Sequence, residues 1–164
     1  MQRRELFGSL GSLFKEKEES EVVESIIRPP YFNDDADFHK SCSSCEAKSC
    51  ATVCEEQIIV IREDGTPELS FAKSGCTFCD ECAIACESDA LHVSFKKHTI
   101  DADVIINQAS CMSWHSTMCF TCKDPCLENA IDFQAMFKPT INMDLCTSCG
   151  FCISRCPVVA IEVS

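Results

Sequence analysis

Residues 146–157 contain four cysteines at a fixed spacing, C-x2-C-x2-C-x3-C, followed directly by Pro157. Three thiolates, each separated from the next by two residues, can surround one face of a cubane. The fourth thiolate lies one helical turn further on and binds a different cubane. Gly150 lets the backbone close around the group, and Pro157 turns the chain away after the last ligand. The spacing therefore predicts a [4Fe–4S] site and a second motif to pair with it. A zinc knuckle is the alternative, but structural zinc takes its ligands as two separate C-x2-C pairs.

Three further groups of four cysteines precede this one, at a period of about 35 residues, and the four groups use all sixteen cysteines of the chain. Their spacings are x2, x4, x3 in the first group, x2, x2, x3 in the second and fourth, and x7, x2, x3 in the third. The predicted metal ligands are Cys42, Cys45, Cys50, Cys54, Cys76, Cys79, Cys82, Cys86, Cys111, Cys119, Cys122, Cys126, Cys146, Cys149, Cys152 and Cys156. Such tight groups indicate ligands rather than disulfides, and no apolar segment resembles a secretory signal. Four [4Fe–4S] clusters are therefore predicted.

A short apolar segment follows each group, at residues 58–61, 90–93, 130–133 and 160–163, and each is predicted to be a strand. Turns at residues 64–67 and at Lys138 and Pro139 are expected to lead into return strands. This order predicts an α+β fold of tandem ferredoxin-like repeats. The expected domains are an arm with a proline linker (residues 1–38), then two 2[4Fe–4S] modules (residues 39–100 and 101–164).

The fourth cysteine of each group is expected to complete the cluster of a neighbouring group. Only 21 residues separate Cys54 from Cys76, and 19 separate Cys126 from Cys146, so pairing of the first group with the second and of the third with the fourth is favoured. Cys54 and Cys86 are then exchanged within one module, and Cys126 and Cys156 within the other. A nested arrangement, first with fourth and second with third, is the alternative that the spacing leaves open.

The first 28 residues differ in composition from the rest of the chain. Apolar side chains at helical spacing occupy residues 6–14, and an acidic run follows at residues 16–24. Two interpretations remain open, namely a flexible, solvated arm and an amphipathic helix that docks on a partner. Residues 28–31 read as a rigid extended linker because they contain two consecutive prolines, and residues 33–35 are expected to cap or turn the chain into the first cysteine group.

Adjacent arginines, Arg3 and Arg4, resemble the start of a twin-arginine export signal. Charged residues at positions 15–19 stand where the apolar core of such a signal would lie. No apolar run approaches the length of a membrane span. The sequence therefore predicts a cytoplasmic protein without an integral membrane segment.

The chain is strongly acidic, with 14 basic and 26 acidic residues and a net charge of −12. Nucleic acid is not expected as a partner because its binding needs a basic face that releases counterions. A basic protein surface is the better electrostatic complement. No arrangement of nucleophile and base and no phosphate-binding loop is visible, so the chain is not expected to be an enzyme or to carry catalytic residues.

Several features resemble the NapF family, the ferredoxin-type proteins of the periplasmic nitrate reductase system. These are the two arginines near the start, residues 27–31, the order of the four cysteine groups, and the seven residues between Cys111 and Cys119. The spacing x4 between Cys45 and Cys50 departs from the family and resembles one group in the four-cluster subunits of molybdopterin oxidoreductases. Proline is also missing after three fourth cysteines, where Glu55, Glu87 and Leu127 stand.

This resemblance implies a cytoplasmic protein that binds the precursor of a NapA-type nitrate reductase catalytic subunit and assists its maturation. An electron-transfer subunit that passes electrons between a donor and a molybdopterin enzyme is the alternative from another class. A sensor of iron or oxygen is a third reading. All three readings use the same ligand residues, so the motifs do not separate them.

Aromatic and apolar residues inside the ligand loops are expected to shield the clusters rather than to relay electrons. These residues are Phe78, Trp114, Met118, Phe120 and Phe151. His115 lies within the third group and is a possible substitute ligand, although the four cysteines make one unnecessary.

Overall fold

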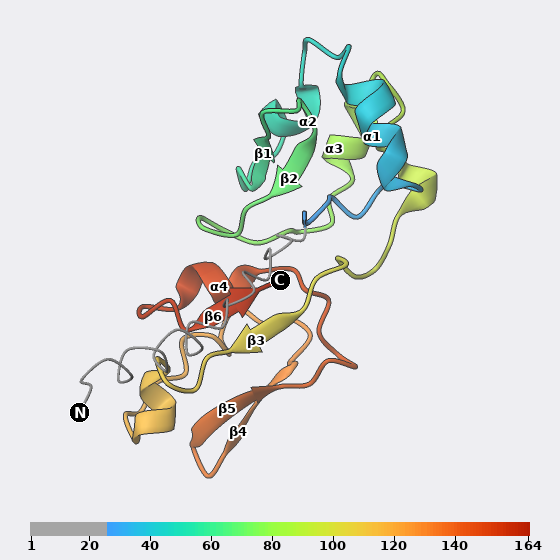
Figure 1. Ribbon diagram of the computed structural model, residues 1–164. Coiled ribbons are helices and arrows are strands. Elements are labelled where there is room, and N and C mark those ends of the chain that lie inside the picture. Colours follow the sequence, from blue (N-terminus) through green and yellow to red (C-terminus); the bar gives the residue numbers. More distant parts are fainter. Residues whose placement is uncertain (1–25) are drawn as a thin grey trace, which may run out of the picture.

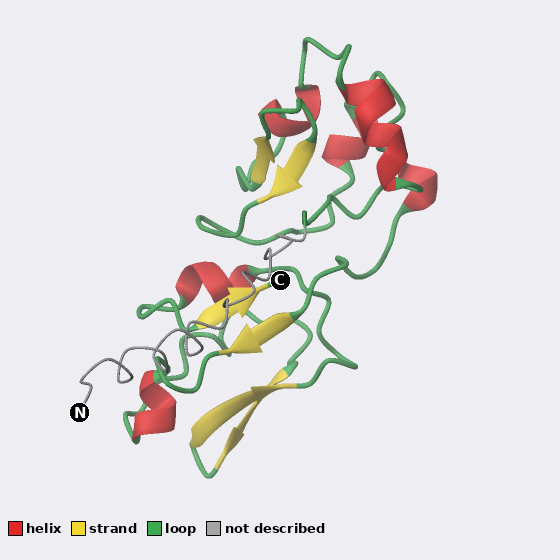
Figure 2. Ribbon diagram, in the orientation of Figure 1, coloured by secondary structure: helices red, strands yellow, loops and turns green. Residues whose placement is uncertain are grey.

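A computed structural model describes residues 26–164, so the apolar stripe at residues 6–14 and the acidic run at residues 16–24 lie outside the described residues. Figure 1 shows two lobes, the first formed by residues 26–100 and the second by residues 101–164. Both lobes combine very short helices with two-stranded antiparallel sheets joined by long loops (Figure 2). The predicted mixture of helices and strands is therefore confirmed. No helix of the described part is long and apolar enough to cross a membrane.

The first lobe contains three helices, one hairpin and one 3₁₀ turn. In chain order these are α1 (Asp35–Cys42), α2 (Ser49–Thr52), β1 (Ile59–Ile61), β2 (Pro67–Leu69), α3 (Glu81–Ile84) and η1 (Val93–Phe95). Helix α1 is capped by Asp34, whose carboxylate accepts a hydrogen bond from the N–H of Ala36, in agreement with the capping or turning role expected for residues 33–35. Strands β1 and β2 pair across the predicted turn, with Ile59 opposite Leu69.

The second lobe contains two antiparallel strand pairs. Its elements are β3 (Val104–Ile106), η2 (Met112–His115), β4 (Ile131–Gln134), β5 (Phe137–Ile141), α4 (Phe151–Arg155) and β6 (Ile161–Val163). Strand β3 pairs with β6, and β4 pairs with β5. The turn predicted at Lys138 and Pro139 is wrong, because both residues lie in β5. The chain turns instead at Ala135 and Met136, whose left-handed backbone matches the twist of a tight hairpin.

The strand predicted at residues 90–93 is also wrong. His92 starts the 3₁₀ turn η1, and its own N–H donates to the carbonyl oxygen of Tyr31 at 2.8 Å. Lys97 donates to the carbonyl oxygen of Pro30 in the same way. Residues 29–31 therefore lie where a partner strand would lie. Because Pro29 and Pro30 have no N–H, they cannot complete the hydrogen-bond ladder of a strand pair.

Residues 28–31, expected to be a rigid extended linker, are packed into the first lobe. Pro29, Pro30 and Tyr31 are buried, and the hydroxyl of Tyr31 accepts a hydrogen bond from the N–H of Asp80. Burial raises the pKa of Tyr31 well above its usual value, so the hydroxyl stays protonated. The proline segment therefore forms part of the core of this lobe.

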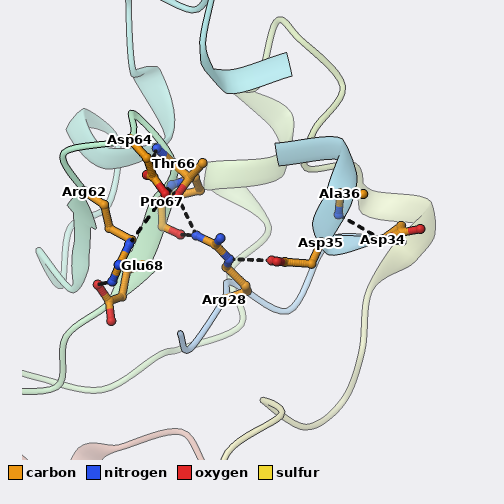
Figure 3. Close-up of polar contacts among 9 residues, drawn as sticks. All are labelled: Arg28, Asp34, Asp35, Ala36, Arg62, Asp64, Thr66, Pro67 and Glu68. Carbon is orange, nitrogen blue, oxygen red and sulfur yellow. Dashed lines mark hydrogen bonds and ion pairs between the residues drawn. The ribbon is translucent and has the colours of Figure 1, made fainter. Parts of the chain in front are cut away.

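Arg28 joins three segments of the first lobe, as Figure 3 shows. Its Nε donates to Asp35 at 2.7 Å, and its Nη1 donates to the Thr66 hydroxyl at 2.8 Å and to the Pro67 carbonyl oxygen at 2.7 Å. The guanidinium also lies 4.8 Å above the Phe38 ring. Because Arg28 is buried, these bonds fix the proline segment against α1 and the hairpin.

The two lobes are in direct contact. The N–H of Ile100 donates to the carbonyl oxygen of Thr147 at 3.0 Å, and the N–H of Cys76 donates to the carbonyl oxygen of Cys149 at 2.6 Å. Gly150 lies against the buried ring of Phe71, so closely that an added Cβ would overlap that ring. The lobes therefore share a close-packed boundary beside the fourth cysteine group.

Candidate metal centres

The sixteen cysteines are all free and line four cavities, named A to D here. Cavity A is lined by Cys42, Cys45, Cys50 and Cys86, and cavity B by Cys54, Cys76, Cys79 and Cys82. Cavity C is lined by Cys126, Cys146, Cys149 and Cys152, and cavity D by Cys111, Cys119, Cys122 and Cys156. Each cavity combines three cysteines of one group with the fourth of its neighbour. The structure thus has the favoured pairing and not the nested one.

Left-handed backbone shapes the ligand loops at equivalent places. Lys48, Asp80 and Gly150 each precede a third cysteine by two residues, and each is the left-handed residue at the start of α2, α3 or α4. A second left-handed residue comes three positions after every fourth cysteine, namely at Gln57, Asp89, Asn129 and Val159. Each fourth cysteine is therefore followed by the same sharp change of chain direction.

At least one sulfur in each cavity accepts a backbone hydrogen bond. The N–H groups of Leu91, Ala130 and Ala160 donate to Cys86, Cys126 and Cys156 at 3.2 to 3.4 Å. The N–H of Phe78 donates to Cys76 in cavity B at 3.4 Å. Such bonds stabilise negative charge on sulfur, which is the form that binds metal.

Burial raises the pKa of the most enclosed thiols. The pKa rises to about 11 for Cys50, Cys76 and Cys122 and to about 12 for Cys82 and Cys152, and neighbouring cysteines add to the rise. Four thiolates could not be kept together in such a cavity without a compensating cation. Metal binding supplies that charge and releases the protons.

The donor set fits a cluster better than a single ion. Within residues 26–164, no group of His, Cys, Asp and Glu side chains is placed to hold one metal ion. The four cysteines of each set instead line one common cavity, as the ligands of a cubane with one thiolate at each iron must do. Apolar side chains close the same spaces, for example Leu91 in cavity A and Ile161 in cavity D.

The third group reaches its cavity in spite of its long spacing. The 3₁₀ turn η2 and the left-handed Ser116 fold the loop so that Cys111 and Cys119 line the same cavity. The Nε2 of His115 forms a hydrogen bond with the carbonyl oxygen of Ala109 at 2.9 Å, and the side chain does not line cavity D. The substitute-ligand hypothesis for His115 therefore has no support in the structure.

The predicted shielding residues differ in position. Phe78 and Phe151 line cavity C, and Phe120 packs against Phe133 at a ring distance of 4.8 Å. The indole N–H of Trp114 donates to the carbonyl oxygen of Pro139 at 3.2 Å, which fixes η2 to β5. Met118 is 63% exposed and shields nothing within the described residues, so that prediction is wrong.

The four cavities follow one another as a series. Cys50 of cavity A lies within electrostatic reach of Cys82 of cavity B, and Cys122 of cavity D lies within reach of Cys152 of cavity C. Between the lobes, Cys76 of cavity B also borders cavity C. The order along the molecule is therefore A, B, C, D, with B and C meeting at the boundary between the lobes.

The chain is similar to known iron–sulfur proteins. The family model of the 4Fe-4S binding domain matches residues 139–162, which contain the fourth cysteine group. The ferredoxin-type protein NapF of Escherichia coli (strain K12) is 34% identical over 139 residues, which cover 82% of this chain and 82% of that protein. NapF of Haemophilus influenzae is 34% identical over 145 residues, which cover 84% and 78%. The methylamine utilization ferredoxin-type protein MauM of Methylorubrum extorquens is 26% identical over 157 residues, which cover 84% and 70%.

Proposed function

Because this chain belongs to the NapF family of ferredoxin-type proteins, we propose that it holds four [4Fe–4S] clusters and assists the maturation of a nitrate reductase catalytic subunit. The partner is the NapA-type precursor, which the protein meets in the cytoplasm. One observation carries the cluster assignment: the sixteen cysteines line four cavities, and each cavity combines three cysteines of one group with the fourth of its neighbour. The assignment of the partner rests on family membership.

Two ferredoxin-like modules hold the clusters, one in each lobe. Cavities A and B exchange Cys54 and Cys86, and cavities C and D exchange Cys126 and Cys156. This exchange is the ligation pattern of a two-cluster ferredoxin. The repeated left-handed residue after every fourth cysteine supports descent of all four sites from one repeating unit.

A bound [4Fe–4S] cluster supplies one-electron redox chemistry. The protein contributes sixteen thiols that bind as thiolates, backbone N–H groups that stabilise the sulfur charge, and apolar walls that exclude water. The protein needs no catalytic residues of its own for this role. Its net charge of −12 suits a basic docking surface on the precursor.

Electron transfer is the second candidate function, and a specific observation favours it. Cavities B and C meet at the boundary between the lobes, so the four clusters would form a continuous series. Cys79 of cavity B is the exposed cysteine among the sixteen and lies beside Glu81 at the surface. An electron would enter or leave the series most easily at this thiolate.

The experiment replaces Cys146 and Cys149 together by alanine in the producing cell and examines the exported reductase. If the protein is a maturation factor, the reductase lacks part of its own iron–sulfur complement and stays inactive with an artificial electron donor. If the protein is an electron carrier, the reductase is fully assembled and active with that donor but inactive with the natural one. The matched control, Ser44→Ala, changes an exposed side chain and should leave both readouts unchanged. Normal activity with the natural donor in the cysteine variant contradicts both functions.

Deletion of residues 1–25 tests the arm separately. A partner-specific arm predicts loss of precursor binding, while the iron content of the remaining chain is unchanged. If the shortened protein binds the precursor as well as the full-length protein does, residues 26–164 carry the recognition of the precursor instead.

A further inference from the structure

The side chain of Lys48 distinguishes cavity A from the other three. Its Nζ donates to the carbonyl oxygen of Cys42 at 2.6 Å and to that of Gly65 at 2.8 Å. Both acceptors belong to residues that line cavity A, and Lys48 itself lines the cavity. The ammonium group is therefore held at the wall of the cavity by two fixed bonds.

No equivalent cation lines the other cavities within the described residues. The structurally equivalent residues before α3 and α4 are Asp80, which forms an ion pair with Lys96 at 2.6 Å, and Gly150. Cavity B is lined by the carboxylates of Glu55, Glu56 and Glu81. Cavity C is lined by one carboxylate, and cavity D by no charged side chain.

Other charges and hydrogen bonds leave cavity A with the most positive surroundings of the four. Backbone N–H groups donate to sulfur in every cavity, and Cys50 of cavity A and Cys122 of cavity D each accept a further one, so these bonds do not separate cavity A from cavity D. Buried Arg28 also acts on Cys42 and adds to the positive potential at cavity A. Glu87 is the opposing charge at cavity A, but its side chain is exposed, so water weakens its effect and it offsets only part of the positive potential of Lys48.

We propose that Lys48 is a positioning residue that makes the cluster in cavity A the most easily reduced of the four. Reduction of a cluster by a one-electron donor adds one negative charge to the cubane and its thiolates, with no bond formed or broken. A fixed ammonium group at the cavity wall favours that added charge. The inference rests on the proposed function, because it requires clusters in the cavities.

The residue type at position 48 distinguishes the first group. Lys48 takes the left-handed position before α2, while Asp80 and Gly150 take the equivalent positions before α3 and α4. The long side chain of Lys48 reaches the carbonyl oxygen of Gly65 at 2.8 Å. The cation at cavity A therefore comes from the lysine at this position.

The experiment is an anaerobic redox titration of the full-length protein, followed by electron paramagnetic resonance. Iron and sulfide are measured first, and fewer than four clusters in the unaltered protein would contradict the proposed function independently of Lys48. In Lys48→Met, we expect the ratio of reduced to oxidised cluster in the highest-potential step to fall about tenfold at a fixed applied potential. This corresponds to a decrease of about 59 mV in the midpoint potential of a one-electron step. The other three steps should keep their midpoints.

Two matched variants separate charge from packing. Lys48→Arg retains the charge and should restore most of the midpoint, whereas Lys138→Met removes an exposed charge in the other lobe and should leave this step unmoved. If Lys48→Met fails to bind the cluster of cavity A, Glu87→Lys decides the matter, because a second cation at this cavity should raise the same step. The proposal is overturned if Glu87→Lys leaves the midpoint of that step unchanged. It is also overturned if Lys48→Met binds a cluster in cavity A and leaves the midpoint unchanged, or if the midpoints of all four steps shift equally.

Discussion

The backbone N–H of Cys76 donates a hydrogen bond of 2.6 Å to the carbonyl oxygen of Cys149. These two cysteines lie 73 positions apart in the sequence, one in each lobe. Because each lines a different cavity, the bond places cavities B and C side by side. The boundary between the lobes therefore determines whether the four sites act as one series or as two separate pairs.

Gly150→Ala tests the packing at this boundary. The substitution places a Cβ in the ring of Phe71 and a side chain at a φ of +84°. Overpacking and the left-handed backbone together predict a loss of about 2–4 kcal/mol in the free energy of unfolding. Gly65→Ala is the matched control, because its φ of +80° is similar but no ring lies against it, and it should cost about 1 kcal/mol. Equal losses in anaerobic denaturant unfolding would remove the steric part of the explanation.

Arg28→Met tests whether the proline segment belongs to the folded core. The change removes bonds to Thr66, Pro67 and Asp35 in a buried place, so unfolding should become easier by about 2–4 kcal/mol. Asp35→Asn should cost less than about 1 kcal/mol, because the Asp35 side chain is 56% exposed. A negligible effect of Arg28→Met in urea unfolding would show that the segment is not part of the core.

Paired cysteine substitutions test the exchange of ligands within the first lobe. Cys45→Ala with Cys86→Ala removes two ligands of the same cavity, so about 12 of about 16 iron atoms per chain should remain. Cys79→Ala with Cys86→Ala removes one ligand from each of two cavities, and about 8 should remain. Equal iron contents in the two double variants would be incompatible with the exchange.

Trp114 provides an optical test of cavity D. It is the one tryptophan of the chain and lies three positions after Cys111 on η2. A cluster absorbs in the range of tryptophan emission, so cluster binding in cavity D should quench the fluorescence. Cys111→Ala with Cys156→Ala should therefore restore emission, whereas Cys45→Ala with Cys86→Ala, in the other lobe, should have a much smaller effect. Similar emission in the two variants would place the indole elsewhere.

The grouping of the cysteines could be predicted because ligand spacing and connection length are local properties of the sequence. Cys54 can reach Cys76 through one short hairpin, and the structure has that arrangement. Three of the four strands expected after the cysteine groups are also present, at β1, β4 and β6. These strands follow the same local pattern of turn and apolar residues.

Long-range contacts account for what the sequence did not reveal. The expected strand at residues 90–93 is replaced because its neighbour is the proline segment, whose Tyr31 lies 61 positions before His92. The role of Lys48 depends on a carbonyl oxygen at Gly65, and the role of Gly150 depends on a ring at Phe71. None of these contacts produces a periodic pattern in the sequence, so they can be identified only in the folded structure.

Iron and acid-labile sulfide content of the anaerobically purified protein tests the central claim most directly. Four cavities with four thiols each predict about 16 iron and 16 sulfide per chain, with negligible zinc. About 8 iron with zinc in the remaining sites would contradict the assignment of all four cavities to [4Fe–4S] clusters.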